Sequence, residues 1–382
     1  MRNTGAYAIS TTFGESVRAF VPHPLPPSRP ALASESFVDL NRVAELALAR
    51  LSGVSGLVPS VDWLLYSAIR KEALLTSQIE GTQATLTDLF DDEAGFTVRN
   101  TEDVQEVTNY LKAFRLVRDN LRAPGGLPLS VRLLCDAHRL LLYGARGAGK
   151  QPGELRRSQN WIGGTRPGNA VFVPPPPDQV PGLLADMERF MHEDGSAPLP
   201  PLVRTALIHV QFETIHPFLD GNGRIGRLLI AALVEHWGLL PEPLMYLSGY
   251  LKQHQVEYYR RLSAVRADGD WEGWVAFFLE GVVVAAAEAE RSIVTIATLL
   301  ALDRRRLLAS PKAGPASYRL FEMLPMMPRF TIEHVRQKLG CSFPTANAAV
   351  KVLEDLGIAV ELTGQKTNRS FSYQPYIAIL TG

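Results

Sequence analysis

Apolar residues recur every three or four positions through most of the first 310 residues, which is the spacing of an amphipathic helix. A strand pattern is nearly absent before residues 169–177, a short β-rich run between Gly-rich and Pro-rich flanks, which predicts one β-hairpin. We therefore expect a mainly α-helical fold. The predicted helices cover residues 38–54, 61–81, 101–121, 129–144, 178–194, 201–216, 224–237 and 271–308, the second stopping at Gly81 as a C-cap.

The two ends of the chain differ from this helical middle. Residues 1–35 are rich in Pro, Ser and Thr without a period, which predicts an extended arm, packed on the surface or partly disordered. Beyond residue 310 the order is helix, Gly turn, helix and two β-rich segments, the outline of a winged helix-turn-helix with a recognition helix at 344–356 and a wing at 364–369. We therefore divide the chain into residues 1–35, 36–110, 111–309 and 310–382.

Composition narrows the cellular setting. The 382 residues are 46% hydrophobic, and 39 Lys and Arg balance 39 Asp and Glu, so no global charge favours nucleic acid or a membrane. The two cysteines, Cys135 and Cys341, are far apart and suit the reduced thiols of a cytosolic protein. No signal peptide is apparent, and the longest apolar run, near 282–287, is far too short to span a membrane. We expect a cytoplasmic protein.

Candidate chemistry is concentrated in "DGNGR", residues 220–224. Gly221 and Gly223 flank Asn222 and permit consecutive main-chain N–H groups to point into one concavity. A helical pattern starts directly afterwards, and a helix N-terminus favours an anion. Arg224 and Arg227 lie three residues apart on that helix and can share a face. Two guanidinium groups beside such a set of amides suit a polyphosphate.

An acid and a histidine complete this segment. Asp220 would repel a phosphate, unless a divalent cation such as Mg²⁺ lies between them. His216 ends the preceding helix, and its neutral imidazole could accept a proton from an incoming hydroxyl. Either piece alone is commonly a helix-ending turn or a hairpin loop. Together they indicate nucleotidyl or phosphoryl transfer to a hydroxyl group.

The stretch "HPFLDGNGRIGR" resembles the signature of the Fic family, and every fixed position of that signature is filled. Fic proteins mostly transfer AMP from ATP to a Ser, Thr or Tyr hydroxyl of a target protein and release pyrophosphate. The resemblance implies a Fic-type helical core with a short β-hairpin flap, and ATP and Mg²⁺ as cofactors. It also implies His216 as general base, Asp220 as Mg²⁺ ligand, Gly221, Asn222 and Gly223 as the anion hole for the α- and β-phosphates, and Arg224 and Arg227 as a clamp on the β/γ end.

Two further segments resemble parts of the same family. Residues 153–177 are similar to the flap hairpin, which aligns the target by main-chain pairing, although alone they suit any surface hairpin. Residues 246–262 are similar to the segment that closes over adenine, with Tyr258 and Tyr259 as candidate contacts, although tyrosines at this spacing are often core residues. The implied target-docking strand consists of Asn169, Ala170, Val171, Phe172 and Val173.

The segment "TSQIEG", residues 76–81, resembles the inhibitory motif of self-restrained Fic proteins. Glu80 falls in the last turn of a predicted helix, where the helix dipole disfavours an anion. A pair with Arg227 would relieve this mismatch and would stop the arginine from holding the γ-phosphate. Restraint would be intramolecular, or exchanged within a homodimer. Without the resemblance, Glu80 suits a solvated surface residue.

Residues 144–150, "GARGAGK", match the spacing of a Walker A loop, but we reject that function. Gln151 stands where the motif needs Ser or Thr, and the preceding segment is helical where a strand is required. The sequence predicts a flexible basic loop.

Several functions remain open at this point. The tail could read DNA through Lys351, Lys366 and Arg369, but its predicted recognition helix is poor in Arg and Gln, which favours protein contact or weak, unspecific DNA binding. The expected function is protein adenylylation, in which the hydroxyl that accepts AMP belongs to a target protein or to the chain itself. The alternatives are AMP removal, transfer of another nucleotide, and a nucleotide-sensing transcription regulator.

Overall fold

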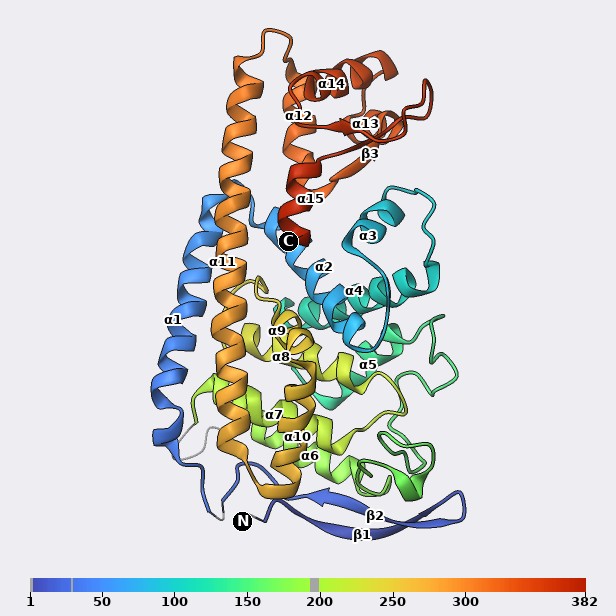
Figure 1. Cartoon of the computed structure of the whole chain (residues 1–382), viewed down its shortest axis with the longest axis vertical. Helices are drawn as coiled ribbons and strands as arrows, with labels where there is room; N and C mark the ends of the chain where they lie inside the picture. The colour runs from blue at the N-terminus through green and yellow to red at the C-terminus, as the bar shows by residue number, and fades with distance from the viewer. Residues whose placement is uncertain (1–2, 29, 193–198) are drawn as a thin grey trace.

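A computed structural model describes residues 3–28, 30–192 and 199–382, and the mainly helical prediction is confirmed (Figure 1). The helices follow the predicted stretches closely, although residues 193–194 of one predicted helix lie outside the described residues. Eleven helices precede the tail: α1 Val38–Val54, α2 Val61–Ile79, α3 Leu86–Glu93, α4 Thr101–Arg122, α5 Val131–Leu141, α6 Val180–His192, α7 Pro201–Ile215, α8 Asn222–His236, α9 Leu247–Gln253, α10 Gln255–Asp268 and α11 Trp271–Ala309, counted over the described ranges.

Helix α7 forms the centre of the core. All of its residues from Leu202 to Ile215 are buried, as expected for a helix that contacts neighbours on every side. It packs against α6, α8, α10 and α11, and Trp274 of α11 donates its indole N–H to the carbonyl of Ala206 at 2.7 Å. Because α7 is held all round, the residue at its C-terminal end, His216, has a fixed position.

The ends of α2 and α3 show local capping. Gly81 follows the C-cap residue Glu80 with a φ of +99°, so the helix stops where the sequence predicted. Helix α3 was not predicted from the hydrophobic pattern because it has only eight residues. It begins with a capping box, in which Thr85 Oγ1 accepts from the Asp88 N–H and Asp88 accepts from the Thr85 N–H.

Residues 5–22 of the predicted arm are extended, but they form a paired hairpin that the sequence pattern did not predict. Strands β1 (Gly5–Thr12) and β2 (Glu15–Pro22) form an antiparallel hairpin that lies across one end of the molecule (Figure 1). Phe13 and Gly14 make the turn, both with positive φ. The buried side chains of Val17 and Ala19 alternate with exposed ones along β2. In the sequence this alternation is short and directly precedes a proline-rich run, so the local strand signal is weak.

The tail contains α12 Pro315–Met323, β3 Arg329–Thr331, α13 Ile332–Leu339, α14 Phe343–Asp355, β4 Val360–Glu361, β5 Ser370–Ser372 and α15 Gln374–Thr381. The strands form an antiparallel sheet in the order β3-β5-β4, and the elements follow in the order expected of a winged helix-turn-helix. Helix α11 ends at the predicted 309/310 boundary, whereas the 110/111 boundary falls inside α4.

The tail contacts two helices of the body that are far apart in the sequence, α3 and α11. Helix α11 has 39 residues, which makes it about 58 Å long, and it runs beside α1 before it reaches the tail (Figure 1). The Tyr373 hydroxyl donates to Asp303 of α11 at 2.8 Å, and Arg329 pairs with Asp91 of α3 at 2.7 Å. None of the described helices has both the length and the apolar character that crossing a bilayer requires.

Candidate active site

His216 has an unusual main-chain conformation. It is the C-cap of α7 with φ 51° and ψ 62°, in the left-handed region that residues with a Cβ rarely adopt. The buried guanidinium of Arg156 holds this turn: its Nε donates to the His216 carbonyl at 2.9 Å and its Nη2 to the Pro175 carbonyl at 2.6 Å. Strain fixed by surrounding groups is typical of functional sites. Sequence analysis gave no signal for Arg156.

The surroundings of His216 keep its imidazole neutral. Burial lowers its pKa to about 4, and the nearby charge of Arg156 acts in the same direction. Among the described residues, Nδ1 is buried without a hydrogen bond of normal geometry, although the main-chain carbonyl of Glu213 partly offsets the effect of burial on the pKa. Since the residue itself is only half-buried, Nε2 is the nitrogen left to face a substrate. A neutral ring can accept a proton at pH 7.

The loop between α7 and α8 is closed by two side chains. Asn222 accepts from the Phe218 N–H and donates to the Phe218 carbonyl, both at 2.8 Å. His138 of α5 stacks on Phe218 with ring centroids 3.8 Å apart, and its Nδ1 accepts from the Gly153 N–H. Its Nε2 must therefore carry the proton and donate to the Asp220 carbonyl at 2.9 Å. His138 was not singled out from the sequence.

The glycine turn that the sequence assigned to an anion lies at the start of α8. Gly221 is the N-cap residue with φ +77°, a conformation that favours glycine, and the helix begins at Asn222. The first-turn amides of a helix have no partner within the helix and carry its positive dipole end. His216, Arg224 and Arg227 all lie close enough to Glu80 to interact with its charge, so the structure brings these side chains together around the turn.

Glu80 and Arg227 form the ion pair that the resemblance implied. The carboxylate lies 2.5 Å from Nη2 of Arg227, which is 3% exposed. Burial disfavours the charge on Glu80, but Arg227 lowers its pKa below the ordinary value. Thr76 also holds the arginine, since its Oγ1 accepts from Nε at 2.6 Å and its carbonyl from Nη2 at 3.1 Å. A Cβ on Gly223 would collide with the Glu80 carboxylate, so Glu80 covers the start of α8.

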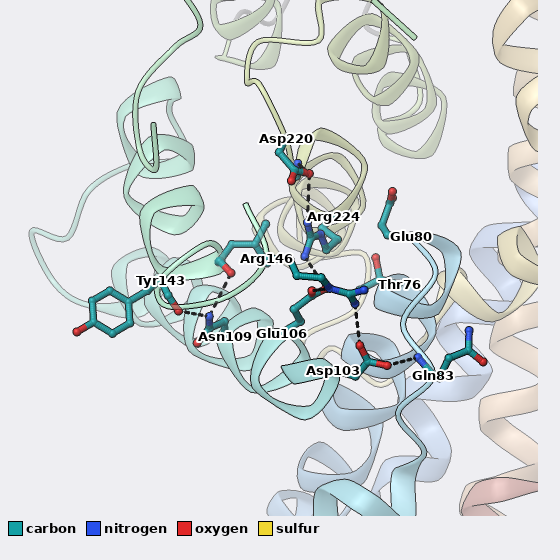
Figure 2. Close-up of polar contacts among 12 residues, drawn as sticks. Thr76, Glu80, Gln83, Asp103, Glu106, Asn109, Tyr143, Arg146, Asp220 and Arg224 are labelled. Atoms are coloured by element: carbon teal, nitrogen blue, oxygen red, sulfur yellow. Dashed lines mark hydrogen bonds and ion pairs between the residues drawn. The ribbon is translucent and has the colours of Figure 1, made fainter. Parts of the chain in front are cut away.

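Asp220 and Arg224 occupy the other side of the turn. Asp220 accepts from the Gly221 N–H at 2.6 Å and lies 3.5 Å from Nη2 of Arg224, while its side chain is 40% exposed (Figure 2). Nη1 of Arg224 donates to Glu106 of α4 at 3.3 Å. The described residues contain no group of three or more His, Cys, Asp or Glu side chains suited to a metal. One accessible carboxylate nevertheless fits Mg²⁺ that is bound mainly through substrate phosphates.

The two tyrosines differ in accessibility. Tyr258 is 1% exposed, and its hydroxyl hydrogen-bonds to Nε2 of His209 at 2.8 Å, so its assignment to the nucleotide was wrong: it belongs to the core. Tyr259 is 45% exposed and stays a candidate for an adenine contact. Neighbouring helical residues point about 100° apart, and here Tyr258 faces the core while Tyr259 faces outward.

The flap is less regular than predicted. Residues 169–173 hold no strand; a 3-10 turn, Pro167–Asn169, is followed by a single bridge between Ile162 and Phe172. Val171 is 79% exposed at the edge, whereas the Val173 carbonyl accepts from the Phe20 N–H of β2 at 2.9 Å. The N-terminal hairpin therefore occupies part of the edge that we had assigned to a target. Asn169 caps the turn, its Oδ1 accepting from the N–H groups of residues 165 and 166, and Ala170 is half-buried.

Two segments of the chain match known protein families. Residues 38–119 match the Fic/DOC family N-terminal region, and residues 128–234 match the Fic/DOC family domain. The chain is 30% identical over 154 residues to "Protein adenylyltransferase Fic" of Drosophila yakuba and of Drosophila melanogaster, which is 40% of this chain and 28% of each relative. The match thus spans less than a third of the length of these relatives.

Solved structures share the fold. A Fic family protein from Desulfovibrio desulfuricans G20 superposes with a TM-score of 0.57 at 22% identity, over 90% of this chain and 97% of that one. Fic-1 from C. elegans superposes with a TM-score of 0.51 at 19% identity, over 70% of this chain and 74% of that one.

Proposed function

Because the chain carries a Fic/DOC N-terminal region followed by a Fic/DOC domain, we propose that it is a protein adenylyltransferase restrained by its own Glu80. It would transfer AMP from Mg·ATP to a Ser, Thr or Tyr hydroxyl of a target protein or of itself. The observation that carries this proposal is the position of His216 beside the amide turn and Arg227, within twelve residues of chain.

The chemical step follows from these positions. The target hydroxyl donates its proton to Nε2 of His216 as its oxygen forms a bond to the α-phosphorus of ATP. The bond from that phosphorus to the bridging oxygen of the β-phosphate breaks, and pyrophosphate leaves. Mg²⁺ held by Asp220 would neutralise charge on the phosphates. The amides of Gly221–Gly223 would stabilise the negative charge that develops on the α- and β-phosphate oxygens, once the Gly221 amide has exchanged Asp220 for the substrate.

Restraint follows from the pair at Arg227. While Glu80 lies over the start of α8, its carboxylate fills the space that a terminal phosphate needs. It also pairs with Arg227, whose positive charge would otherwise attract that phosphate. ATP then binds without the alignment required for transfer. We infer that the reaction starts when Glu80 moves away from Arg227, within one chain or by exchange between two copies in a homodimer.

The decisive experiment is incorporation of label from α-³²P ATP into protein, with γ-³²P ATP in parallel. The unmodified chain, Glu80→Gly and Glu80→Gly/His216→Ala are compared, with Glu80→Gly/His334→Ala as control because His334 lies in the tail, in α13. We expect label from the α position only, strongest in Glu80→Gly and at least about 100-fold lower without His216. Labelled UTP and GTP tested in the same way separate the nucleotides.

Label from neither position would contradict the proposal and would favour AMP removal or nucleotide sensing. Label from the γ position would indicate phosphoryl transfer instead. Equal label with and without His216 would remove it as the base. Salt-dependent, sequence-selective DNA binding by a chain that labels no protein would favour the regulator.

A further inference from the structure

The glycine-rich loop of residues 144–150, which the chemistry above does not use, is fixed against Asp220. Asn109 of α4 anchors its start by donating to the carbonyls of Leu141 and Tyr143, at 3.3 and 2.7 Å (Figure 2). Gly147 has φ +89°, and a Cβ there would lie 2.6 Å from Oδ2 of Asp220. The loop was predicted to be flexible and basic; in the structure it packs directly on the carboxylate assigned to Mg²⁺.

One buried carboxylate joins this loop to the signature motif. Glu106 accepts from Nε of Arg146, in the loop, at 2.5 Å and from Nη1 of Arg224 at 3.3 Å. The side chains of Glu106 and Arg224 are each 5% exposed, whereas that of Arg146 is 54% exposed. A buried carboxylate is stabilised by such pairing, and removing a partner leaves an uncompensated charge.

Arg224 is therefore oriented toward carboxylates. Its Nη1 contacts Glu106 and its Nη2 lies 3.5 Å from Asp220, while among the described residues its buried Nε has no partner. The surroundings of Arg227 differ, because its ion-pair partner is Glu80, which we propose moves away during the reaction. The two arginines of the motif thus have different surroundings.

We propose that Glu106 and Arg146 are positioning residues that hold Arg224 against Asp220, so that Arg224 sets the orientation of the Mg²⁺ ligand and Arg227 alone contacts the terminal phosphates. This inference rests on the proposed function and refines it. It replaces the expectation that Arg224 and Arg227 together clamp the β/γ end of the nucleotide.

The same chain of contacts extends to the inhibitory segment. Asp103 of α4 accepts from Nη2 of Arg146 at 2.7 Å and from the main-chain N–H of Gln83 at 2.6 Å (Figure 2). Gln83 lies three residues after Glu80, so a change at Arg146 could also loosen the restraint. A chain that already lacks Glu80 separates the two effects, because no restraint is left to loosen.

The test therefore uses Glu80→Gly as parent and adds Glu106→Gln, Arg146→Ala or Arg146→Lys. Arg42→Ala is the matched control, since Arg42 is 71% exposed on α1 and its carboxylate partner is 3.9 Å away. Calorimetric titration with a non-hydrolysable ATP analogue, with and without Mg²⁺, is combined with AMP transfer as a function of Mg²⁺ concentration. Thermal unfolding checks that each variant is folded.

Mg²⁺ raises the affinity for the ATP analogue by some factor, and we expect this factor to be about tenfold smaller in Glu106→Gln and Arg146→Ala, equal to about 1.4 kcal/mol. Affinity for the analogue without Mg²⁺ should change less than twofold. The Mg²⁺ concentration for half-maximal transfer should rise by a similar factor. Arg146→Lys should recover part of the loss, because it keeps the charge but not the fixed pair of donors. Arg42→Ala should match the parent.

Two results would overturn the inference. Equal losses of affinity with and without Mg²⁺ would show that Glu106 and Arg146 only stabilise the fold, and unchanged affinity in both would show no role. A parent that transfers no AMP would instead contradict the proposed function, and the titrations would still decide whether the pair acts on Mg²⁺ binding.

Discussion

Replacing Glu80 with Gly is the most direct perturbation of the site. Arg227 would lose the carboxylate 2.5 Å from its Nη2 but keep its contacts with Oγ1 and the carbonyl of Thr76, at 2.6 and 3.1 Å. The guanidinium should therefore stay in place and become available to a phosphate. It need not be ordered again when ATP binds, so most of the released interaction energy should appear as affinity.

The size of the effect follows from the pair. A hydrogen bond between charged groups contributes about 1.5–3 kcal/mol net. The Glu80 side chain is 35% exposed, so solvent screening places the value near the lower end, at about 1.5–2 kcal/mol. At about 1.4 kcal/mol per factor of ten, ATP should bind or react roughly 10- to 30-fold better in Glu80→Gly.

ATP affinity by calorimetry and the initial rate of AMP transfer measure this gain. Glu80→Gln, which keeps the shape and removes the charge, should give most of it, and Glu80→Ala controls for the flexibility of glycine. If all three variants stay within twofold of the unmodified chain, the pair is not a restraint. A gain in Glu80→Gly alone would assign the effect to a loosened end of α2.

Three further predictions concern the base, the flap and the tyrosines. Because the pKa of His216 is about 4, kcat/KM of the unrestrained variant should change less than about twofold from pH 8 to pH 5.5. A base with the ordinary pKa of histidine would lower kcat/KM about tenfold over the same range. A tenfold fall would mean that the free enzyme does not bury its base. Val17→Ala should destabilise the small cluster beneath the flap by about 1–2 kcal/mol and speed amide exchange in residues 162–172, whereas unchanged exchange there would show that the hairpin does not support the flap. Tyr258→Phe should lower stability by about 1–2 kcal/mol and leave the KM for ATP unchanged, whereas Tyr259→Ala should raise that KM; the reverse pattern would restore Tyr258 as the adenine contact.

The sequence alone was sufficient where the signal is local. Helix positions follow from the spacing of apolar residues. The turn at 220–224 follows from its glycines, because glycine readily adopts the positive φ that such a turn requires. The ion pair between Glu80 and Arg227 joins residues 147 positions apart, and no local pattern contains it. It was expected only because a family resemblance placed both residues in known motifs.

The supporting residues were missed because their partners are distant and their local contexts are ordinary. Arg156, His138 and Glu106 reach groups 60, 82 and 118 positions away, respectively. An arginine in a loop or a glutamate on a helix is usually solvated, so its type carries no signal. Only the packed structure shows that these three are buried and directed at the motif.

The contact between the tail and α2 offers a route by which a partner bound to the tail would influence the restraint on ATP. Helix α2 ends at Ile79, directly before Glu80. With α3 and the tail it lines a cavity of about 490 Å³, bordered by Tyr66, Phe90 and Met327. A partner whose affinity for the tail depends on the position of α2 would change the affinity for ATP by some factor. Linkage then requires ATP to change the affinity for that partner by the same factor. With such a partner, the chain would report whether a nucleotide is bound on a surface remote from the nucleotide, even when it transfers nothing.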